Sequence, residues 1–490
     1  MLPGVTLPAS LAMLLGALRP CFTAPSFRTF CGLAAGLAGQ VRRRTVCGML
    51  PGADLARAWP HDRAHYFFAR ARWQVDELGL AVARLVVLLL VPPGEPLTVA
   101  VDDSVFRRSG RKVHGAGWQY DGSSPSPDRL SFGTCFVTCG IVVHLPFCTR
   151  PVCLPVLARL VPAGKTKVPA RARKRKKAAP LPGTKVSAAT SLVALLAAAF
   201  PGRAIDVVAD AAYHGPALKH LPAAVTWTWR LRANAVLYDP APPRAPGTKG
   251  RPRRKGERLG TPGQLAAAAR WAPATVRIYR RDQDIHLADI TCLWYGCLDT
   301  RTVRVILARD DAGVLALVTT DLTAGAAALI TRYAARWSIE QAFADARNVL
   351  GAGEARNRTR RAVERTVPFA LLTCTLIITW YARHGHHRAG ITARRHAQPW
   401  YHAKTEPAFE DMLTQLRRVL ITARISKGSS WSPRTLVDRF PLCRICIRHI
   451  NRFLKTQRTQ FTQAALFPDA VVVPLDVVEY RGPGLFGIPP

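Results

Sequence analysis

Three acidic side chains, far apart in the chain, are the first candidates for chemistry: Asp102, Asp210 and Glu340. Carboxylate oxygens are the ligands that hard divalent cations such as Mg2+ prefer. Two such ions, about 3.5–4 Å apart, can activate a water or a 3′-hydroxyl for attack on a phosphodiester and can stabilise the leaving oxygen. A chain with 31 acidic residues contains such triples by chance, so the local sequences must decide whether these three share a site.

The first two acids follow segments that read as β-strands. Residues 97–101 form an apolar run that ends directly at Asp102, and residues 204–209 form a second run that ends at Asp210. A helical pattern over residues 188–200 precedes the second run. Helix followed by strand is typical of α/β proteins, whose ligands gather at the carboxyl ends of the strands. We therefore predict that each of these two acids stands at a strand end.

The segment around Glu340 has the spacing of one helix face. Arg336, Glu340 and Arg347 follow Tyr333 by 3, 7 and 14 residues, so at about 100° per residue all four side chains share a stripe. A carboxylate between two guanidinium groups suits a site that holds cations and phosphates. The alternative is a solvated face with i,i+3 and i,i+4 ion pairs. The pattern also leaves open whether the helix breaks near Trp337.

The charge balance narrows the class of partner. The chain has 69 Lys and Arg against 31 Asp and Glu, a formal net charge of +38, and such an excess repels itself unless a polyanion covers it. Nucleic acid is the expected polyanion. Anionic membrane is the competitor, but the basic residues are dispersed, and the longest apolar run, 367–381, is short for a bilayer and contains Pro368. We expect no membrane contact and a cytoplasmic, nucleoid-associated protein.

The cysteines do not indicate a disulfide framework. Twelve of them are scattered over 490 residues, and Cys443 and Cys446 form the only C-x-x-C pair. His449 nearby gives a weak indication of zinc, but the sequence lacks a second pair at zinc-site spacing. Buried reduced thiols are therefore the preferred interpretation.

Composition divides the chain into five regions. The sequence Pro-Pro-Gly at 92–94 ends an apolar helical part, and strand patterns and acids then alternate up to the Glu340 segment. The predicted regions are a helical N-terminal DNA-binding region at 1–95, the first part of a catalytic core at 96–221, a β-rich insertion at 222–320, the second part of the core with the Glu340 helix at 321–390, and a basic C-terminal region at 391–490.

Three local patterns taken together resemble the insertion-sequence transposases of the DDE superfamily. They are Asp102-Asp-Ser104, Val208-Ala-Asp-Ala-Ala-Tyr-His-Gly215, and the spacing of Tyr333, Arg336, Glu340 and Arg347. The last matches the family signature Tyr-(2)-Arg-(3)-Glu-(6)-Lys, except that arginine replaces lysine. Arginine keeps the positive charge and can fork onto phosphate. The basic, glycine-rich stretch 104–120 is also similar to the family's segment after the first acid.

The resemblance implies an α/β fold with an RNase H-like core, an inserted β-rich domain and helical N- and C-terminal regions. It implies a metal-dependent DNA endonuclease and strand transferase that cuts transposon ends and joins them to target DNA by hydrolysis and transesterification, as a homodimer. Two Mg2+ ions, with Mn2+ as a substitute, would be held by Asp102, Asp210 and Glu340, with Asp103 as the alternative to Asp102. The expected DNA-binding residues are Tyr333, Arg336, Arg347, Arg107, Arg108, Lys112, Arg173, Lys174, Arg175, Arg253 and Arg254.

Two other interpretations stay open from the sequence. A copy with a decayed active site would bind DNA without cutting it, although the presence of all three acids argues against decay. A structural or regulatory nucleic-acid protein would have the same charge, with the three acids as ordinary surface groups. A cleavage assay with Mg2+ separates these interpretations from the nuclease.

Overall fold

The computed structural model describes residues 4–41, 44–122, 124, 128–163, 184–244, 250–279, 281–398, 400 and 402–427. The described residues up to 420 belong to one compact unit, which contains all three predicted acids. Two features of the sequence lie outside the described residues, namely the basic stretch with Arg173, Lys174 and Arg175 and the Cys443–Cys446 pair.

The N-terminal part of the chain is helical. Its elements are α1 (Ala9–Gly16), the 3-10 turn η1 (Arg19–Cys21), α2 (Ala24–Gly39), α3 (Met49–Gly52), α4 (His61–Ala69) and α5 (Val75–Leu90). Helix α5 lies so close to the sheet that a Cβ added at Gly79 would be 2.3 Å from the carbonyl oxygen of Val156. The helical structure predicted here is confirmed, and its role in DNA binding stays a prediction.

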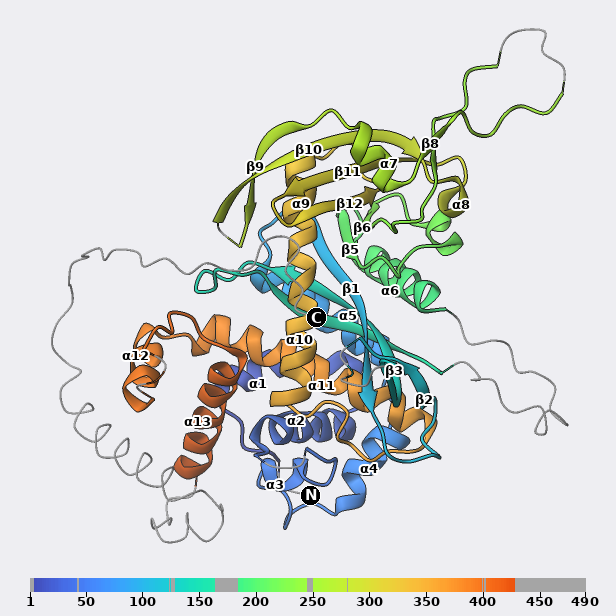
Figure 1. Ribbon diagram of the computed structural model, residues 1–490. Coiled ribbons are helices and arrows are strands. Elements are labelled where there is room, and N and C mark those ends of the chain that lie inside the picture. The colour runs from blue at the N-terminus through green and yellow to red at the C-terminus, as the bar shows by residue number, and fades with distance from the viewer. Residues whose placement is uncertain are drawn as a thin grey trace, which may run out of the picture. The chain divides into compact units, whose positions relative to one another are not determined.

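A mixed sheet with one crossover helix forms the core around the acids. The elements are β1 (Leu97–Arg107), β2 (Gly117–Tyr120), β3 (Leu130–Val143), β4 (Val152–Val161), α6 (Lys185–Ala199), β5 (Ile205–Ala209), the short turn η3 (Pro216–His220) and β6 (Val225–Arg230). Strands β1, β3 and β4 are antiparallel neighbours, whereas β5 pairs in parallel with β1 and β6 in parallel with β5. The order β4-β3-β1-β5-β6 gives the RNase H-like core that the resemblance implied (Figure 1).

Strand β1 is longer than the sequence pattern predicted. It was expected to end at Val101, but it continues to Arg107 and stays paired with β3, so Asp102 and Asp103 lie inside a strand. The apolar run stops at these acids, although the backbone pairing does not. Parallel pairing with β5 ends at Val101, and among the described strands none pairs with that edge of β1 further on. The two aspartates therefore begin an open strand edge.

The insertion continues the core sheet. Its elements are β7 (Leu237–Tyr238), β8 (Arg258–Gly260), α7 (Pro262–Ala268), β9 (Ala272–Ile278), β10 (Arg281–Leu293), α8 (Tyr295–Leu298), β11 (Thr302–Asp310) and β12 (Gly313–Thr319). Strand β12 pairs with the core strand β6, and β11, β10, β7 and β8 follow it outward. The predicted β-rich character is confirmed, with two short helices among the strands. A continuous twelve-stranded sheet thus links the insertion to the core.

The Glu340 segment is not one regular helix. Helix α9 (Ala326–Ala334) passes into the 3-10 turn η4 (Ala335–Trp337), then α10 (Ser338–Ala344), and then the π-helical turn η5 (Asp345–Val349). The prediction of a single stripe assumed a constant rotation per residue, and that assumption is wrong here. The break has a positional cause, because α9 packs on β9, η4 contacts both β1 and β5, and α10 packs on β1 and β4.

Helix α11 (Arg360–Trp380) and its π-helical end η6 (Tyr381–Gly385) lie in the interior. Within the described residues this is the one helix long and apolar enough to cross a membrane, and 94% of its apolar window is buried inside the protein. Its Arg365 donates hydrogen bonds to the backbone oxygens of Phe67, Phe68 and Ala71, which fixes it to the end of α4. Helices α12 (Arg388–Ala397) and α13 (Phe409–Lys427) follow.

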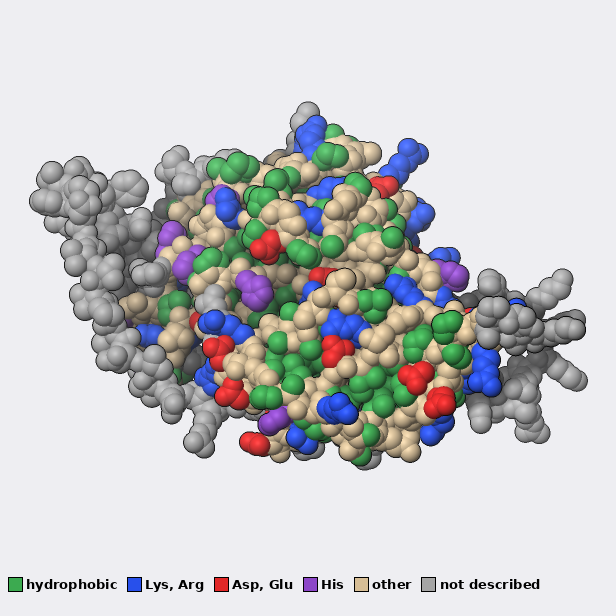
Figure 2. Space-filling model, turned by 90° about the horizontal axis from the view of Figure 1, so that it is seen from above, with side chains coloured by type: hydrophobic (Ala, Val, Ile, Leu, Met, Phe, Trp, Pro, Cys, Tyr) green, Lys and Arg blue, Asp and Glu red, His purple; other side chains and the backbone are tan. Residues whose placement is uncertain are grey.

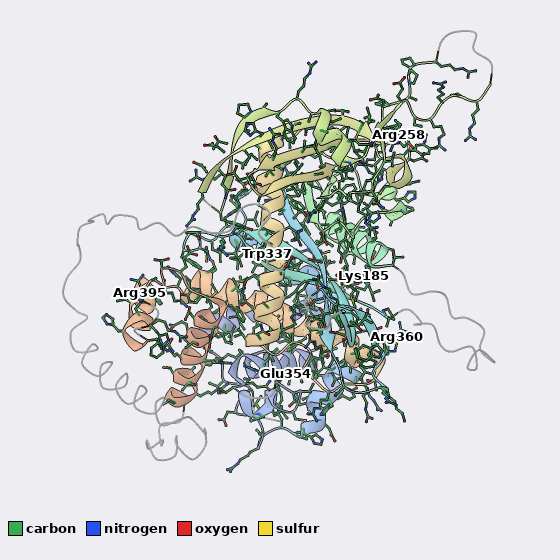
Figure 3. All side chains as sticks on the ribbon, in the orientation of Figure 1. Lys185, Arg258, Trp337, Glu354, Arg360 and Arg395 are labelled. Carbon is green, nitrogen blue, oxygen red and sulfur yellow. The ribbon has the colours of Figure 1, made fainter. Side chains whose placement is uncertain are left out.

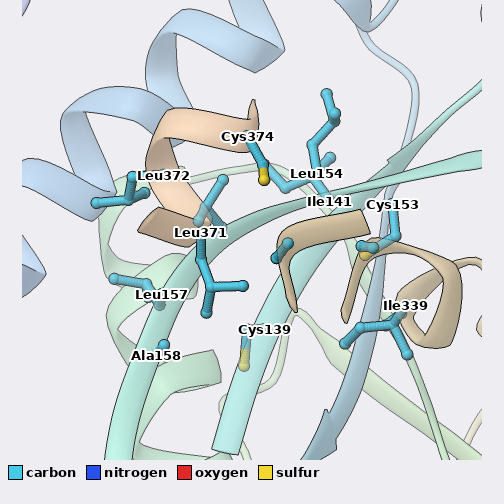
Figure 4. Packing of buried hydrophobic residues seen from close by; sticks show 14 of the residues in the cluster. Cys139, Ile141, Cys153, Leu154, Leu157, Ala158, Ile339, Leu371, Leu372 and Cys374 are labelled. Atoms are coloured by element: carbon cyan, nitrogen blue, oxygen red, sulfur yellow. The ribbon is translucent and has the colours of Figure 1, made fainter. Parts of the chain in front are cut away.

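Two hydrophobic clusters fix the position of the Glu340 segment. Ile339 of α10 is fully buried in the larger cluster, where it packs with residues of β3, β4 and α11 (Figure 4). Leu329 and Ile330 of α9 are fully buried in a second cluster with β9, β10, β11 and β12. Because both ends of the segment are anchored by apolar side chains, the polar side chains between them have a fixed orientation toward the sheet.

Candidate active site

Asp102 and Asp210 follow equivalent positions on neighbouring strands. Val101 is paired with Ala209 in the parallel β1–β5 ladder, and the two aspartates are the next residues along each chain. Neighbouring strands are about 5 Å apart, and side chains at the same level of a parallel pair point to the same face. The ladder therefore brings together two carboxylates separated by more than one hundred residues of sequence.

Arg336 connects these strands to Glu340. Its guanidinium donates hydrogen bonds to Asp102 Oδ2 at 3.1 Å and to Glu340 Oε1 at 3.0 Å. Burial lowers the pKa of the same guanidinium, but Tyr333 and the carboxylates of Asp102, Glu340 and Asp210 raise it by more. Asp210 is therefore close enough to act on Arg336. Only 13% of the Arg336 side chain is exposed. Acids from three distant segments thus surround one buried cation.

Burial disfavours the charged forms of two of these carboxylates. Burial raises the pKa of Asp102 to about 7; Arg336 opposes the rise, and Asp103 and Glu340 add to it. Burial also raises the pKa of Glu340, again against Arg336 and with a contribution from Asp210. Burial therefore outweighs the attraction of the single guanidinium, and a further cation would favour the ionised forms of Asp102 and Glu340.

Asp103 faces the opposite side of β1, where it is fully engaged. It accepts hydrogen bonds from Lys185 Nζ at 2.6 Å, from the Tyr213 hydroxyl at 2.9 Å and from Cys135 Sγ at 3.2 Å. Lys185 is the first residue of α6 (Figure 3), and Tyr213 follows Asp210 by three residues. Successive side chains of a strand point to opposite faces, so the two adjacent aspartates have separate surroundings. This geometry favours Asp102 over Asp103 as the metal ligand.

A buried ion cluster sets the position of α9 beside the site. Arg332 pairs with Asp206 of β5 at 3.2 Å and with Asp321 at 3.0 Å. Asp321 also accepts hydrogen bonds from the amides of Thr323 and Ala324, which hold its pKa at about 2 despite burial. The cluster joins α9 to the strand that ends beside Asp210, one helical turn before Arg336.

The structure separates the members of the predicted helix signature. Tyr333 stays with the acids, since its ring lies 5.9 Å from the Arg336 guanidinium carbon. Arg347 lies in η5, and the charges that act on it are Asp121 and Arg107 instead of the three acids. Arg336 is occupied by the carboxylates, including the intrahelical pair with Glu340 that the sequence allowed as the alternative.

The other predicted DNA-binding residues differ in how accessible they are. Arg107, Lys112 and Arg253 are exposed. Arg108 donates to the backbone oxygens of Gly353 and Ala355, and burial lowers its pKa to about 10, so it fastens the loop after η5. Arg254 is paired with Asp299 at 2.6 Å. Lys and Arg side chains on the face shown in Figure 2 are spread among acidic and apolar ones.

A cavity of about 820 Å3 borders Asp210. Its lining includes Arg230, Arg232 and Asn234 from the end of β6 and the loop that follows, and Pro262 from α7. Its basic lining beside a site carboxylate makes it suited to an anionic strand. His214 lines a neighbouring cavity, where its ring is paired with the Ala211 carbonyl oxygen at 2.9 Å and stacked on Trp294.

Sequence reasoning missed the residues that hold the site in place. Tyr213 lies in the motif Val208–Gly215, three residues after Asp210, and this position could have marked it as a residue near the site. Lys185 and Arg332 gave no local signal, because their partners Asp103 and Asp206 are distant in the sequence. Long-range pairs of this kind follow only from the fold.

The chain matches one family description. A model of the family described as DDE superfamily endonuclease matches residues 17–284, more than half of the chain. The matched region contains Asp102 and Asp210 and ends before Glu340, whose place beside them is given by the geometry above. A search of curated proteins found none similar to this chain.

Proposed function

Because the chain belongs to the DDE superfamily endonucleases, we propose that it is a transposase that cuts transposon ends and joins them to target DNA. Family membership makes the chain a nuclease with DNA as its substrate, and nucleases of this superfamily generally use divalent metal ions. The proposal adds the joining step, the identity of the residues that act and the identity of the ion.

One observation supports the assignment of residues above the others. The Arg336 guanidinium contacts Asp102 and Glu340 directly and is acted on by Asp210, so the three acids are neighbours around a single positive charge. The described part of the chain contains no group of three His, Cys, Asp or Glu side chains already arranged to hold a metal ion. We attribute this to Arg336, whose cation lies between two of the carboxylates.

The donor set fits hard divalent cations. Three carboxylates from the ends or interior of two strands and from a helix supply oxygen ligands. Burial raises the pKa values of Asp102 and Glu340, and a bound cation would favour their ionised forms. We assign Asp102, Asp210 and Glu340 as the ligands of two Mg2+ ions. When bound, such ions activate the attacking oxygen and stabilise the leaving one.

The chain's own residues would position the DNA for in-line attack. In hydrolysis, a water oxygen bonds to phosphorus and gives up a proton, the bond to the 3′-oxygen breaks, and that oxygen takes up a proton, which leaves a 3′-hydroxyl and a 5′-phosphate. In joining, that 3′-hydroxyl attacks a target phosphodiester, its proton is lost, and the target's 3′-oxygen leaves. No covalent bond to the protein forms. Arg230 and Arg232 in the cavity beside Asp210 would bind phosphates of the strand next to the scissile bond.

Nicking of DNA by a matched pair of variants tests the assignment. Glu340→Gln keeps the size of the side chain and removes its charge, and we expect it to abolish Mg2+-dependent nicking of a plasmid that carries the DNA flanking the coding region, without loss of DNA binding. The control is Glu364→Gln, because Glu364 also forms an i,i+4 pair with an arginine at 3.0 Å and has nearly the same exposure. Full activity of the Glu340 variant would remove this residue from the site.

The joining step needs its own measurement. A donor fragment with a free 3′-hydroxyl should become covalently linked to plasmid DNA in the presence of Mg2+, and two copies of the chain are expected in the active complex because two ends must be paired. Nicking without any joining would restrict the function to that of an endonuclease.

A further inference from the structure

The ribbon formed by β2 and the start of β3 exposes aromatic side chains on one face. Trp118 is 56% exposed and Tyr120 is 61% exposed, and they stand two residues apart, which places them on the same face of β2. Their cross-strand partners Phe132 and Leu130 belong to that face as well, and Leu130 is 39% exposed. Large apolar groups gathered at an exposed position usually mark a contact surface.

The other face of this ribbon packs against the protein. Gln119 lies between the two aromatic residues and donates to the Gly133 carbonyl oxygen at 3.0 Å, and its partner Ser131 is buried. Trp118 is held by an edge contact with Phe132, whose ring centre is 5.8 Å away. The aromatic face is therefore presented on a fixed support.

The charge around the ribbon identifies its partner as a polyanion. Residues 107–130 contain five arginines and lysines and two aspartates, a net charge of +3, and the exposed cations include Arg107, Arg111, Lys112 and Arg129. Two copies of this positive surface would repel each other, which argues against pairing of β2 with a second chain. The same charge attracts DNA.

Aromatic faces bind nucleic acid by stacking on bases whose own stacking has been broken. Arg107 ends β1 five residues after Asp102, and β3 pairs Gly133 with both Arg107 and Gly117. At about 3.4 Å per residue, Trp118 lies roughly 20 Å along the strand direction from the acids.

We propose that the ribbon is a single-strand DNA site, in which Trp118 and Tyr120 stack on bases roughly 20 Å or more from the bond that is cut. The proposal rests on the proposed function, since the distance of roughly 20 Å from the cut assumes cleavage beside Asp102. The ligand class is unpaired DNA at an opened end. Arg107 and Lys112 supply the contacts to phosphate.

Binding measured without metal tests the ribbon separately from catalysis. The probes are an oligothymidylate about 20 nucleotides long and a duplex of equal length, titrated at several salt concentrations in EDTA. Trp118→Ala/Tyr120→Ala should weaken binding of the single strand at least about tenfold, with the salt dependence unchanged. Arg107→Ala/Lys112→Ala should instead make the negative slope of log K against log salt shallower by about 1.4.

Two further variants keep the test decisive. Tyr120→Ala alone preserves the contact between Trp118 and Phe132, so it shows the effect even if the double variant unfolds. Leu322→Ala, between β12 and α9, removes a large apolar side chain of similar exposure, 51%, and should leave binding unchanged. Equal binding by wild type and both ribbon variants would overturn the proposal, as would equal weakening for duplex and single strand. A change of oligomeric state in the ribbon variants would assign the surface to a second copy instead.

Because the binding assay contains no divalent cation, its result does not depend on whether the acids cut DNA. Loss of nicking in Glu340→Gln with intact ribbon binding supports both proposals. Loss of ribbon binding in the Trp118 and Tyr120 variants is informative even for a chain that does not cleave.

Discussion

Two adjacent aspartates of β1 point to opposite faces of the sheet and have different partners. On one face, Asp102 shares a single guanidinium with Glu340, and its pKa is raised to about 7 mainly by burial. On the other face, Asp103 has an ammonium, a phenol and a thiol within hydrogen-bonding distance. The sequence Asp-Asp alone does not distinguish them, whereas the partners do. Asp102, which shares its one cation with Glu340, is suited to bind a metal ion. Asp103, which accepts hydrogen bonds from three side chains, is suited to stabilise the fold.

The largest expected difference between the two faces is in catalysis. Asp102→Asn should reduce divalent-dependent nicking to the level of a reaction without protein, because the site loses a charged ligand. Asp103→Asn should keep measurable nicking, because its partners lie behind the site. Plasmid nicking by both purified variants, with circular dichroism to confirm folding, checks this. The comparison fails if Asp103→Asn is as inactive as Asp102→Asn while it remains folded.

A second test removes the cation on the Asp102 face. Arg336→Gln leaves the largely buried Asp102 and the partly exposed Glu340 without their partner and should destabilise the protein by about 2–3 kcal/mol at pH 8, mainly through Asp102. The loss should be smaller at pH 5. Because the pKa of Asp102 in the folded state is about 7, this group is protonated at pH 5 and carries no charge that needs a partner. Urea unfolding at both pH values measures the difference.

Arg336→Lys is the matched control, since it keeps a positive charge at the same position. Added Mg2+ should raise the melting temperature of Arg336→Gln more than that of the wild type, because the carboxylates are then available to the ion. An equal Mg2+ effect in the two proteins would contradict the idea that Arg336 occupies the place of a bound cation.

The smallest expected effect concerns the Asp103 face. Tyr213→Phe removes only the hydroxyl that donates to Asp103 and should cost about 1 kcal/mol of stability, with nicking retained. Burial, and next the Asp103 charge, raise the pKa of Tyr213 well above its usual value, so the loss should be constant from pH 6 to pH 9. Thermal unfolding across this range checks the prediction, with Tyr66→Phe on the surface as the control. Loss of activity in folded Tyr213→Phe would give this face a catalytic role.

The positions of the strands and the choice of acids followed from the sequence because their signals are local. Apolar runs before Asp102 and Asp210 gave β1 and β5, and strand patterns before the Glu340 segment gave the β-rich insertion. The meeting of Asp102 and Asp210 then required only that the two strands be parallel neighbours. The role of these acids as metal ligands stays a prediction.

The rest of the site depends on contacts that no local pattern contains. The break at Ala335–Trp337 occurs among residues that suit a helix, and it follows from the contact of η4 with both β1 and β5. The end of β1 was misplaced because the apolar run stops at Asp102, whereas pairing with β3 continues. The partners of Asp103 come from α6, β3 and the loop after β5, so they are set by tertiary structure alone.

The unbroken run of hydrogen-bonded strands from β10 to β5 has a mechanical consequence. Strands β11, β12 and β6 lie between them, each bonded to its neighbours, so the insertion cannot turn as a separate body without disrupting that ladder. A partner that displaces the β9–β10 hairpin would therefore alter the strain on β5, the strand that is followed by Asp210. Binding of a partner at β9 and β10 and the distance between Asp102 and Asp210 are therefore coupled through the sheet backbone, without any flexible hinge.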